Sequence, residues 1–421
     1  MTRVVVIGGG LSGLVAARHL AEADVEVHLV ERRKDVGGRV RSRYEDGFTF
    51  DRGFQVLFTA YPAAQRELDY EKLDLRYFTP GATIARPGSR SVLADPLRDP
   101  SSLVETVFNR EISPMDKLRV LRLQRELAGK REAEIFHGPD TGIEGYLTER
   151  GFSRRFVANF AAPFYGGITL DRSLSTSKAV FEYTFKMLSE GRIALPAAGM
   201  GAISKQLAEK ARNAGVEIAL ETTAEGVSAD RHGATVDLGS ETLSPDAVIV
   251  ATDPPTAREL TGIEAIPTDA HGCVTQYFSL PAHEVLSTGK KLILNAQSDA
   301  PNHVAPLSVV APEYTPDNRG LLSVTFLGER EETAAELAEH TENALASWYP
   351  GRSFDGLKLL HTERVPFSQF VQPPGFQKNL LAPDAPNGPV FLAGDFMEWS
   401  SIHGALSSGR RAAEATLERV S

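Results

Sequence analysis

The feature that most constrains this chain is a glycine-rich turn near its start, at residues 8–13. A β-branched apolar run at residues 4–7 precedes the turn, and a helical pattern at residues 11–21 follows it. A second apolar run, at residues 25–30, completes a strand, turn, helix and strand within about 30 residues. This order predicts one βαβ unit of a doubly wound parallel sheet.

The spacing of the three key glycines suits a bound dinucleotide. Gly8 makes the tight turn, Gly10 lets a pyrophosphate approach the backbone, and Gly13 lets the helix pack closely on the strand. Glu31 ends the second strand, where a carboxylate accepts hydrogen bonds from ribose hydroxyls and disfavours a ribose phosphate. A purely structural glycine-rich turn is the alternative, and the fingerprint alone does not separate FAD from NAD.

The segments beyond this unit resemble the flavin amine oxidase superfamily, which includes monoamine oxidases, protoporphyrinogen oxidase and carotenoid desaturases. Residues 31–39, with a Gly-Gly-Arg end, resemble its ribose and diphosphate segment. Residues 50–55 resemble its Asp-x-Gly turn, and residues 394–405 resemble its C-terminal flavin motif. Residues 163–168 and 195–200 resemble the branch of phytoene desaturase and protoporphyrinogen oxidase. The resemblance implies FAD as the cofactor.

The motif and the resemblance together imply a set of cofactor-binding residues. Arg33 is expected on the ribose side and Arg39 at the diphosphate, where a guanidinium suits a dianionic linker. Ala224 is expected against the adenine, and Ile402 at the pyrimidine edge of the flavin. The full set is Gly8, Gly10, Leu11, Ser12, Gly13, Glu31, Arg32, Arg33, Gly37, Gly38, Arg39, Gly53, Phe54, Gln55, Ala224, Gly394, Asp395, Ser401, Ile402 and Ala405.

The expected architecture is an α/β, Rossmann-like FAD-binding domain with an interleaved α+β substrate domain. The first comprises residues 1–60, 193–268 and 386–421, and the second comprises residues 61–192 and 269–385. Several segments in the earlier part of the substrate domain look mainly helical. Helices are expected there at residues 113–131, 142–160 and 175–189.

Composition limits the partners that the protein can have. The 421 residues carry a formal net charge of −10, which works against binding the nucleic-acid backbone. Cys273 is the only cysteine, so a disulfide within the chain and a thiolate metal cluster are excluded, and no metal site is expected. The cytoplasm is the expected location. Basic and apolar residues mix at residues 113–132, where peripheral contact with a membrane is an alternative to a solvated helix face.

The reaction is less constrained than the cofactor. An alignment places Gln276 where monoamine oxidases carry a lysine, and Ser401 where they carry an aromatic residue, while Trp399 is expected to pack elsewhere. These departures favour hydride transfer from a small hydrophobic substrate over amine oxidation, with dioxygen or a quinone as electron acceptor. Gln276 and His403 are candidate catalytic residues, although His403 also suits a capping or solvent-facing position.

Three functions therefore remain open. The first is a desaturase- or oxidase-type FAD enzyme whose substrate is isoprenoid or contains a ring. The second is a flavin-dependent amine oxidase. The third is a flavin-free binding protein that resembles the GDP-dissociation inhibitors, against which the intact glycine motifs argue.

Overall fold

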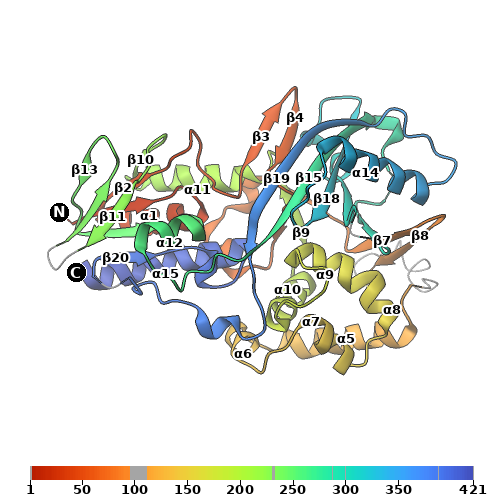
Figure 1. The fold of residues 1–421 in the computed structure, drawn as a ribbon, viewed down its shortest axis with the longest axis horizontal. Coiled ribbons are helices and arrows are strands. Elements are labelled where there is room, and N and C mark those ends of the chain that lie inside the picture. The colour runs from red at the N-terminus through yellow and green to blue at the C-terminus, as the bar shows by residue number, and fades with distance from the viewer. Residues whose placement is uncertain are drawn as a thin grey trace.

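The computed structural model describes residues 2–94, 111–229, 233–286, 288–298, 300–386 and 388–420. It has two lobes, and both termini lie on the same one, as Figure 1 shows. Three long strands, β15, β18 and β19, belong to the other lobe, and β15 and β19 extend toward the first. The fold is α/β, as the sequence predicts.

The sheet of the first lobe is parallel throughout and has the order β10-β2-β1-β14-β20. Its strands are β1 (Arg3–Ile7), β2 (Glu26–Val30), β10 (Glu217–Ala219), β14 (Ala247–Val250) and β20 (Val390–Leu392). Helices α1 (Leu11–Ala21), α11 (Gly201–Asn213) and α15 (Ile402–Val420) belong to this lobe, and α1 packs against both of the others. Strand β14 is buried along its whole length, as its continuous apolar run requires in a sheet that is covered on both faces.

The glycine-rich turn joins β1 to α1 as expected. The Gly8 N–H donates to the Val30 carbonyl oxygen at 2.8 Å. A Cβ atom on Gly13 would lie 2.0 Å from the Gly8 carbonyl oxygen, so only glycine lets the helix start this close to the strand.

The second lobe contains a mixed sheet with the order β19-β15-β18-β17-β16-β7-β8. Its strands are β7 (Gly81–Arg86), β8 (Ser89–Ala94), β15 (Ala270–Pro281), β16 (Leu292–Asn295), β17 (His303–Pro306), β18 (Arg319–Leu327) and β19 (Lys358–Phe370). Helix α14 (Ala334–Trp348) begins with a capping box between Thr333 and Glu336. Its apolar face joins Val274, Phe278 and other sheet residues in one core cluster.

Helices fill the rest of the second lobe, below this sheet in Figure 1. They are α5 (Pro114–Ala128), α6 (Glu132–Phe136), α7 (Ile143–Glu149), α8 (Arg154–Phe156), α9 (Ala162–Thr169) and α10 (Lys178–Glu190), with a π-helical turn at Val157–Ala161. Leu123, Tyr146 and Phe181 are among the buried residues of their shared core. None of the helices in the described ranges is both long and apolar enough to cross a membrane.

Shorter elements complete the described chain. The strands are β3 (Ser42–Glu45), β4 (Phe48–Asp51), β5 (Leu57–Phe58), β6 (Leu75–Tyr77), β9 (Ile193–Pro196), β11 (Gly226–Ala229), β12 (Ala234–Asp237) and β13 (Thr242–Leu243). The helices are α2 (Pro62–Glu67), α3 (Tyr70–Leu73), α12 (Pro254–Thr261) and α13 (Leu307–Val310). Five-residue or shorter 3₁₀ turns lie between them. The domain boundaries given above stay a prediction.

One expectation about the second lobe is wrong, and one edge of its sheet lies where no strand is expected. Strands β7 and β8, within residues 61–192, form the far edge of the large sheet. Strand β7 pairs in parallel with β16, about two hundred residues later, and a local pattern does not report such a distant partner. The helix expected at residues 142–160 is broken near Gly151, whose φ is +78°, and Ser153 caps a new helix by accepting a hydrogen bond from the Phe156 N–H.

Candidate functional site

A single cavity of about 790 Å³ lies where the two lobes meet. Its first part is lined by the turn after β1, the end of β2 and the N-terminus of α15. Its second part is lined by α9, β16, β17 and β18 of the other lobe. The cavity is thus continuous from the dinucleotide turn of one lobe to the sheet of the other.

The first part of the cavity has the open backbone that a diphosphate needs. A Cβ atom on Gly10 would meet no atom within 4 Å, so the space beside this residue is free. Glu31 is buried, and its carboxylate accepts hydrogen bonds from the Gly9 N–H at 2.8 Å and the Arg33 N–H at 3.0 Å. These bonds fix the carboxylate at the end of β2 while lone pairs remain for ribose hydroxyls.

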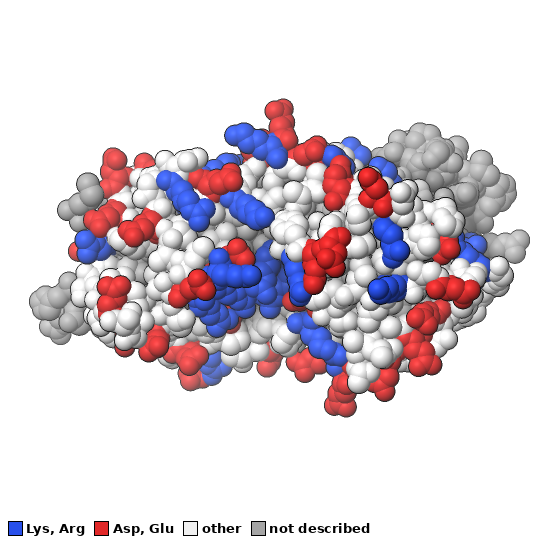
Figure 2. Space-filling view, turned by 90° about the horizontal axis from the view of Figure 1, so that it is seen from above, with Lys and Arg blue, Asp and Glu red and all other residues white. Residues whose placement is uncertain are grey.

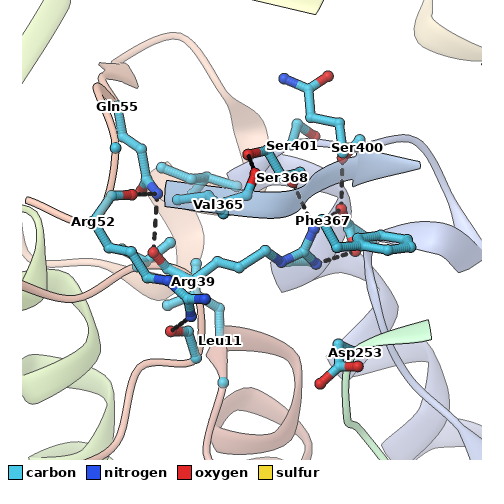
Figure 3. A pocket seen from close by; sticks show the side chains of 18 of the residues that line it. Leu11, Arg39, Arg52, Gln55, Asp253, Val365, Phe367, Ser368, Ser400 and Ser401 are labelled. Carbon is cyan, nitrogen blue, oxygen red and sulfur yellow. Dashed lines mark hydrogen bonds and ion pairs between the residues drawn. The ribbon is translucent and has the colours of Figure 1, made fainter. Parts of the chain in front are cut away.

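Arg39 crosses the middle of this part of the cavity, as Figure 3 shows. Its guanidinium donates to both Asp395 oxygens, at 2.5 and 3.1 Å, and to the Ser368 carbonyl oxygen at 3.0 Å. Ser400 donates to the same carboxylate at 2.7 Å. The contact joins the loop after β2 to the segment after β20, so two segments far apart in the sequence form one wall.

Positive charge gathers at the cavity. The Arg52 guanidinium lies 3.4 Å from Glu363 and donates to the Gly38 carbonyl oxygen at 3.3 Å. Burial and the neighbouring Arg41 and Arg33 lower the pKa of Arg52 to about 10, so it stays charged at neutral pH. Figure 2 shows basic side chains gathered near the middle of one face. These guanidinium groups suit a dianionic ligand.

The N-terminus of α15 closes the cavity on another side. The Ser401 hydroxyl accepts a hydrogen bond from the Gly404 N–H at 2.8 Å, which caps the helix. Ile402 and Ala405 also line the cavity. The positive end of a 19-residue helix therefore faces it, where it stabilises negative charge.

The sequence model of one protein family matches residues 11–417, nearly the whole chain. The family is described as "Flavin containing amine oxidoreductase". The chain belongs to this family. Membership places it among flavin-dependent oxidoreductases and assigns FAD as its cofactor, and the open backbone at Gly10 and the surrounding cations fit that molecule. The flavin-free binding protein is not supported.

Individual relatives agree with this membership. The chain is 22% identical to 15-cis-phytoene desaturase of Capsicum annuum, over 99% of this chain and 78% of that protein. It is 24% identical to carotenoid 3,4-desaturase of Haloarcula japonica, and this match covers 59% of the chain and only 55% of the relative. A solved putative protoporphyrinogen oxidase from Exiguobacterium sp. 255-15 has the same fold, with a TM-score of 0.74, 18% identity and 99% of each chain covered.

Nearly all of the expected cofactor-binding residues line the cavity. They are Gly8, Gly10, Leu11, Ser12, Glu31, Arg32, Arg33, Gly37, Gly38, Arg39, Gly53, Phe54, Gln55, Ala224, Gly394, Asp395, Ser401, Ile402 and Ala405. Gly13 does not line the cavity, since it lies against the Gly8 carbonyl oxygen inside the turn. Its role is packing. The contacts of the others with FAD stay a prediction.

Gln276 does not line the cavity. Its amide group donates to the Ala334 carbonyl oxygen at 2.7 Å and to the Thr362 hydroxyl at 3.2 Å, on the side of the sheet that carries α14. Because side chains alternate along a strand, the neighbours Cys273 and Thr275 lie on the opposite face. Cys273 lines the cavity, and Thr275 approaches Gly53. Gln276 therefore lies on the face of the sheet opposite to the cavity, and its expected place beside the flavin is wrong.

His403 is neither solvent-facing nor part of the cavity lining. It is buried, and its Nδ1 accepts a hydrogen bond from the Ala63 N–H at 3.3 Å. Its Nε2 lies 3.2 Å from Glu132 on α6. These contacts give it a structural place between the lobes rather than a catalytic one.

Several lining residues were not identified from the sequence. Val365, Phe367, Ser368 and Gln369 line the cavity from β19, a strand whose internal Pro366 argues against strand structure. Strand β19 bulges at this point, because His271 and Cys273 of β15 are two residues apart while their partners, Gln369 and Val365, are four residues apart. Arg52, inside the Asp-x-Gly segment, also has no role in the sequence-based assignment.

Four aromatic residues lie at or near the cavity. Phe54 and Phe164 line the cavity, as expected of groups that hold an apolar substrate. Tyr165 does not, because it packs on Phe160, Phe164 and Phe181 in the helical core. Trp399 does line the cavity, contrary to the expectation that it packs elsewhere.

Proposed function

We propose that the protein is an FAD-dependent oxidoreductase that removes hydride from a hydrophobic, isoprenoid- or ring-containing substrate, as desaturases and related oxidases do. The observation that carries the proposal is the composition of the second part of the cavity. Its lining includes Phe78, Pro163, Phe164, Ile168, Leu170, Leu292 and Leu294. Binding of an apolar compound against such a lining is favourable, because it takes apolar surface out of water.

Electrostatics of this second part disfavour a charged amine. Among the described residues that line the cavity, none is a lysine. The acidic lining residues, Glu31, Glu225, Asp253, Glu259 and Asp395, all belong to the nucleotide part. A protonated amine that entered the second part would lose its hydration without gaining a counter-charge, which is costly.

Bound FAD supplies the hydride acceptor. The chain's own contribution is to hold the substrate and to exclude water. Phe54, on the segment at Gly53, lies at the junction of the two parts, with its ring 6.2 Å from that of Phe78 and 5.1 Å from the imidazole of His303. Positioning in a dry cavity supplies much of the rate for such transfers, so a strong protein base is not required.

The test is anaerobic stopped-flow mixing of the flavoprotein with alkenes, partly reduced rings and simple amines. We expect the flavin to bleach with apolar ring or polyene compounds and to stay oxidised with benzylamine and tyramine. Rapid bleaching by the amines alone would overturn the proposal and favour an amine oxidase. The reduced protein is then mixed with dioxygen or with a soluble quinone. The compound that restores the absorbance of oxidised flavin faster is identified as the electron acceptor.

A second proposal concerns the surface of α5, at the outer edge of the second lobe in Figure 1. Met115, Leu118 and Leu121 are exposed on this helix, and the side chains of Arg122 and Arg125 are exposed beside them. Apolar and basic groups on one exposed helix suit an anionic lipid surface, which is also where a greasy substrate would be dissolved.

Sedimentation with vesicles tests this contact. We expect the protein to pellet with vesicles that contain phosphatidylserine and to stay in solution with neutral vesicles. Leu118→Gln combined with Leu121→Gln is expected to lower the bound fraction several-fold without changing the flavin spectrum. Equal sedimentation of this variant and the unaltered protein would contradict the proposal.

A further inference from the structure

One row of side chains crosses the large sheet on the side that faces the cavity. Leu294 of β16 pairs with His303 of β17, His303 pairs with Thr325 of β18, and Thr325 pairs with Thr275 of β15. Directly paired residues of an antiparallel ladder lie on the same face. Leu294, His303 and Thr325 all line the cavity, so two polar groups sit within its apolar second part.

Asn302, next to this row, has a fixed amide orientation. Its Oδ1 accepts a hydrogen bond from the Arg172 guanidinium at 2.7 Å, and its Nδ2 donates to the Pro163 carbonyl oxygen at 3.0 Å. A flipped amide would place a donor against the guanidinium, so the two contacts settle which end is the nitrogen. Arg172 is itself anchored on the Asn295 carbonyl oxygen at 2.8 Å.

The Asn302 amide then fixes the tautomer of the neutral His303 ring. Its Nδ2 lies 3.1 Å from the His303 Nδ1, and an amide nitrogen only donates. Nδ1 must therefore be the acceptor, which places the single ring proton of a neutral imidazole on Nε2. Burial lowers the pKa of His303 to about 4, so the ring is neutral at physiological pH and presents one N–H donor.

That donor has no partner among the described residues. The His303 Nε2 and the Thr325 hydroxyl oxygen are both buried, and neither makes a hydrogen bond within the part of the chain that the structure describes. Both atoms are shielded from bulk solvent, so water outside the protein does not satisfy them. An unsatisfied buried donor is destabilising, and such a group in a ligand cavity is explained when the ligand supplies the acceptor.

We propose that His303 and Thr325 form a subsite for an uncharged oxygen of the substrate, such as a ketone, an ester or a hydroxyl group. The substrate is then an apolar ring or chain with a hydrogen-bond acceptor, rather than a pure hydrocarbon. An uncharged acceptor is specified because His303 is held neutral and the lining around it is apolar. The inference rests on the proposed function, since it concerns the same cavity.

A matched pair of probes tests the subsite on the FAD-loaded protein. 1-Tetralone and tetralin share one ring skeleton and differ by a carbonyl oxygen, and binding of either is followed by the change it causes in flavin absorbance. We expect His303→Leu and Thr325→Val each to raise the Kd of 1-tetralone about five- to tenfold, the scale of one lost hydrogen bond. The Kd of tetralin should stay within about twofold.

Ser323→Ala is the matched control, because this buried hydroxyl lies on the same strand and face, two residues from Thr325, and does not line the cavity. It should change neither Kd. His303→Gln keeps an N–H donor and should recover part of the ketone affinity. An equal change for both probes in the leucine and valine variants, or no binding of either probe to the unaltered protein, would overturn the subsite. These titrations do not use flavin reduction, so failure of the proposed reaction would show separately, as a flavin that no apolar compound bleaches.

Discussion

Gly10 and Gly13 belong to one motif but constrain the molecule for different reasons. Gly13 must be glycine for the fold, because a Cβ atom would strike the Gly8 carbonyl oxygen. Gly10 has an ordinary backbone conformation, with φ −75° and ψ 179°, and free space beside it. The fold does not require glycine at this position, so we expect its lack of a side chain to serve the ligand.

Gly10→Ala should consequently fold but bind FAD poorly. The methyl group would occupy space that the diphosphate needs, and overpacking of this kind costs about 1–3 kcal/mol, roughly five- to 150-fold in Kd. Titration of the apoprotein with FAD measures the change. Gly129→Ala is the control, since this glycine also has free space and an ordinary backbone but lies at the end of α5. An unchanged FAD affinity in Gly10→Ala would remove this residue from the site.

At this scale, the sequence predicts residues that line the nucleotide part of the cavity better than residues that line its second part. Glu31, Arg39 and Asp395 follow from spacing and from segments with a fixed order along the chain. Gln276 was misplaced because its position depends on which face of a buried strand it occupies, and a shift of one residue reverses that face. The hydrogen bonds from Arg172 through Asn302 to His303 join distant segments and leave no local pattern.

Helices α1 and α15 pack closely against each other beside the cofactor part of the cavity. Gly409, on α15, allows this approach, because a Cβ atom there would lie 2.3 Å from the Ser12 carbonyl oxygen. The first turn of α1 carries Leu11 and Ser12, which line the cavity. Packing between two helices from opposite ends of the chain thus positions the dinucleotide turn.

Gly409→Ala should therefore lower both stability and FAD affinity. Separating the two helices is expected to cost about 1–3 kcal/mol of unfolding free energy, measurable by thermal melting with and without added FAD. Gly145→Ala offers a matched helical comparison. Gly145 is exposed on α7 with only one ordinary contact nearby, so alanine there should stabilise the helix by roughly 0.5–1 kcal/mol. If both variants had the same melting temperature, the close packing of α1 on α15 would not limit the stability of the protein.

Elements were predictable where one periodicity runs uninterrupted. The strands and helix of the first βαβ unit are of this kind. Strand β19 could not be predicted, because Pro366 interrupts it and is tolerated only where β19 bulges against β15. Strands β7 and β8 depend on β16, a distant partner that closes the sheet beside them.

Across the whole molecule, Asp51 joins the two lobes. Its carboxylate accepts hydrogen bonds from the Ser42 hydroxyl at 2.5 Å, the Met200 N–H at 2.9 Å and the Tyr314 hydroxyl at 3.0 Å. The Tyr277 hydroxyl donates to its backbone carbonyl oxygen at 2.7 Å. Burial raises the pKa of Asp51 to about 6 despite these bonds, so the contact between the lobes contains a carboxyl group that titrates near neutrality.

This pKa predicts a pH dependence of stability. The pKa in the folded protein lies above the usual value of 3.8, so the folded state binds more protons between about pH 4 and 6, and ionisation lowers stability as the pH rises through that window. Asp51→Asn cannot ionise. The unfolding free energy of the variant minus that of the unaltered protein should rise by roughly 2–3 kcal/mol from pH 4 to pH 7. Denaturant melts measure it, with Asp384→Asn, at an exposed position, as the control. A difference that stays constant with pH would show that Asp51 does not titrate in this window.

The central claim is that hydride leaves a carbon–hydrogen bond of an apolar ring or chain, rather than the carbon–hydrogen bond next to an amine nitrogen. The product of one anaerobic turnover tests this claim most directly. The flavoprotein is mixed with an excess of the ring or polyene compound that bleaches it fastest. The mass of the organic product is then measured by mass spectrometry. The account predicts one product molecule per reduced FAD, lighter than the substrate by two hydrogen atoms and with every other atom retained. Flavin reduced only by amines, with ammonia and an aldehyde released after hydrolysis, would contradict it.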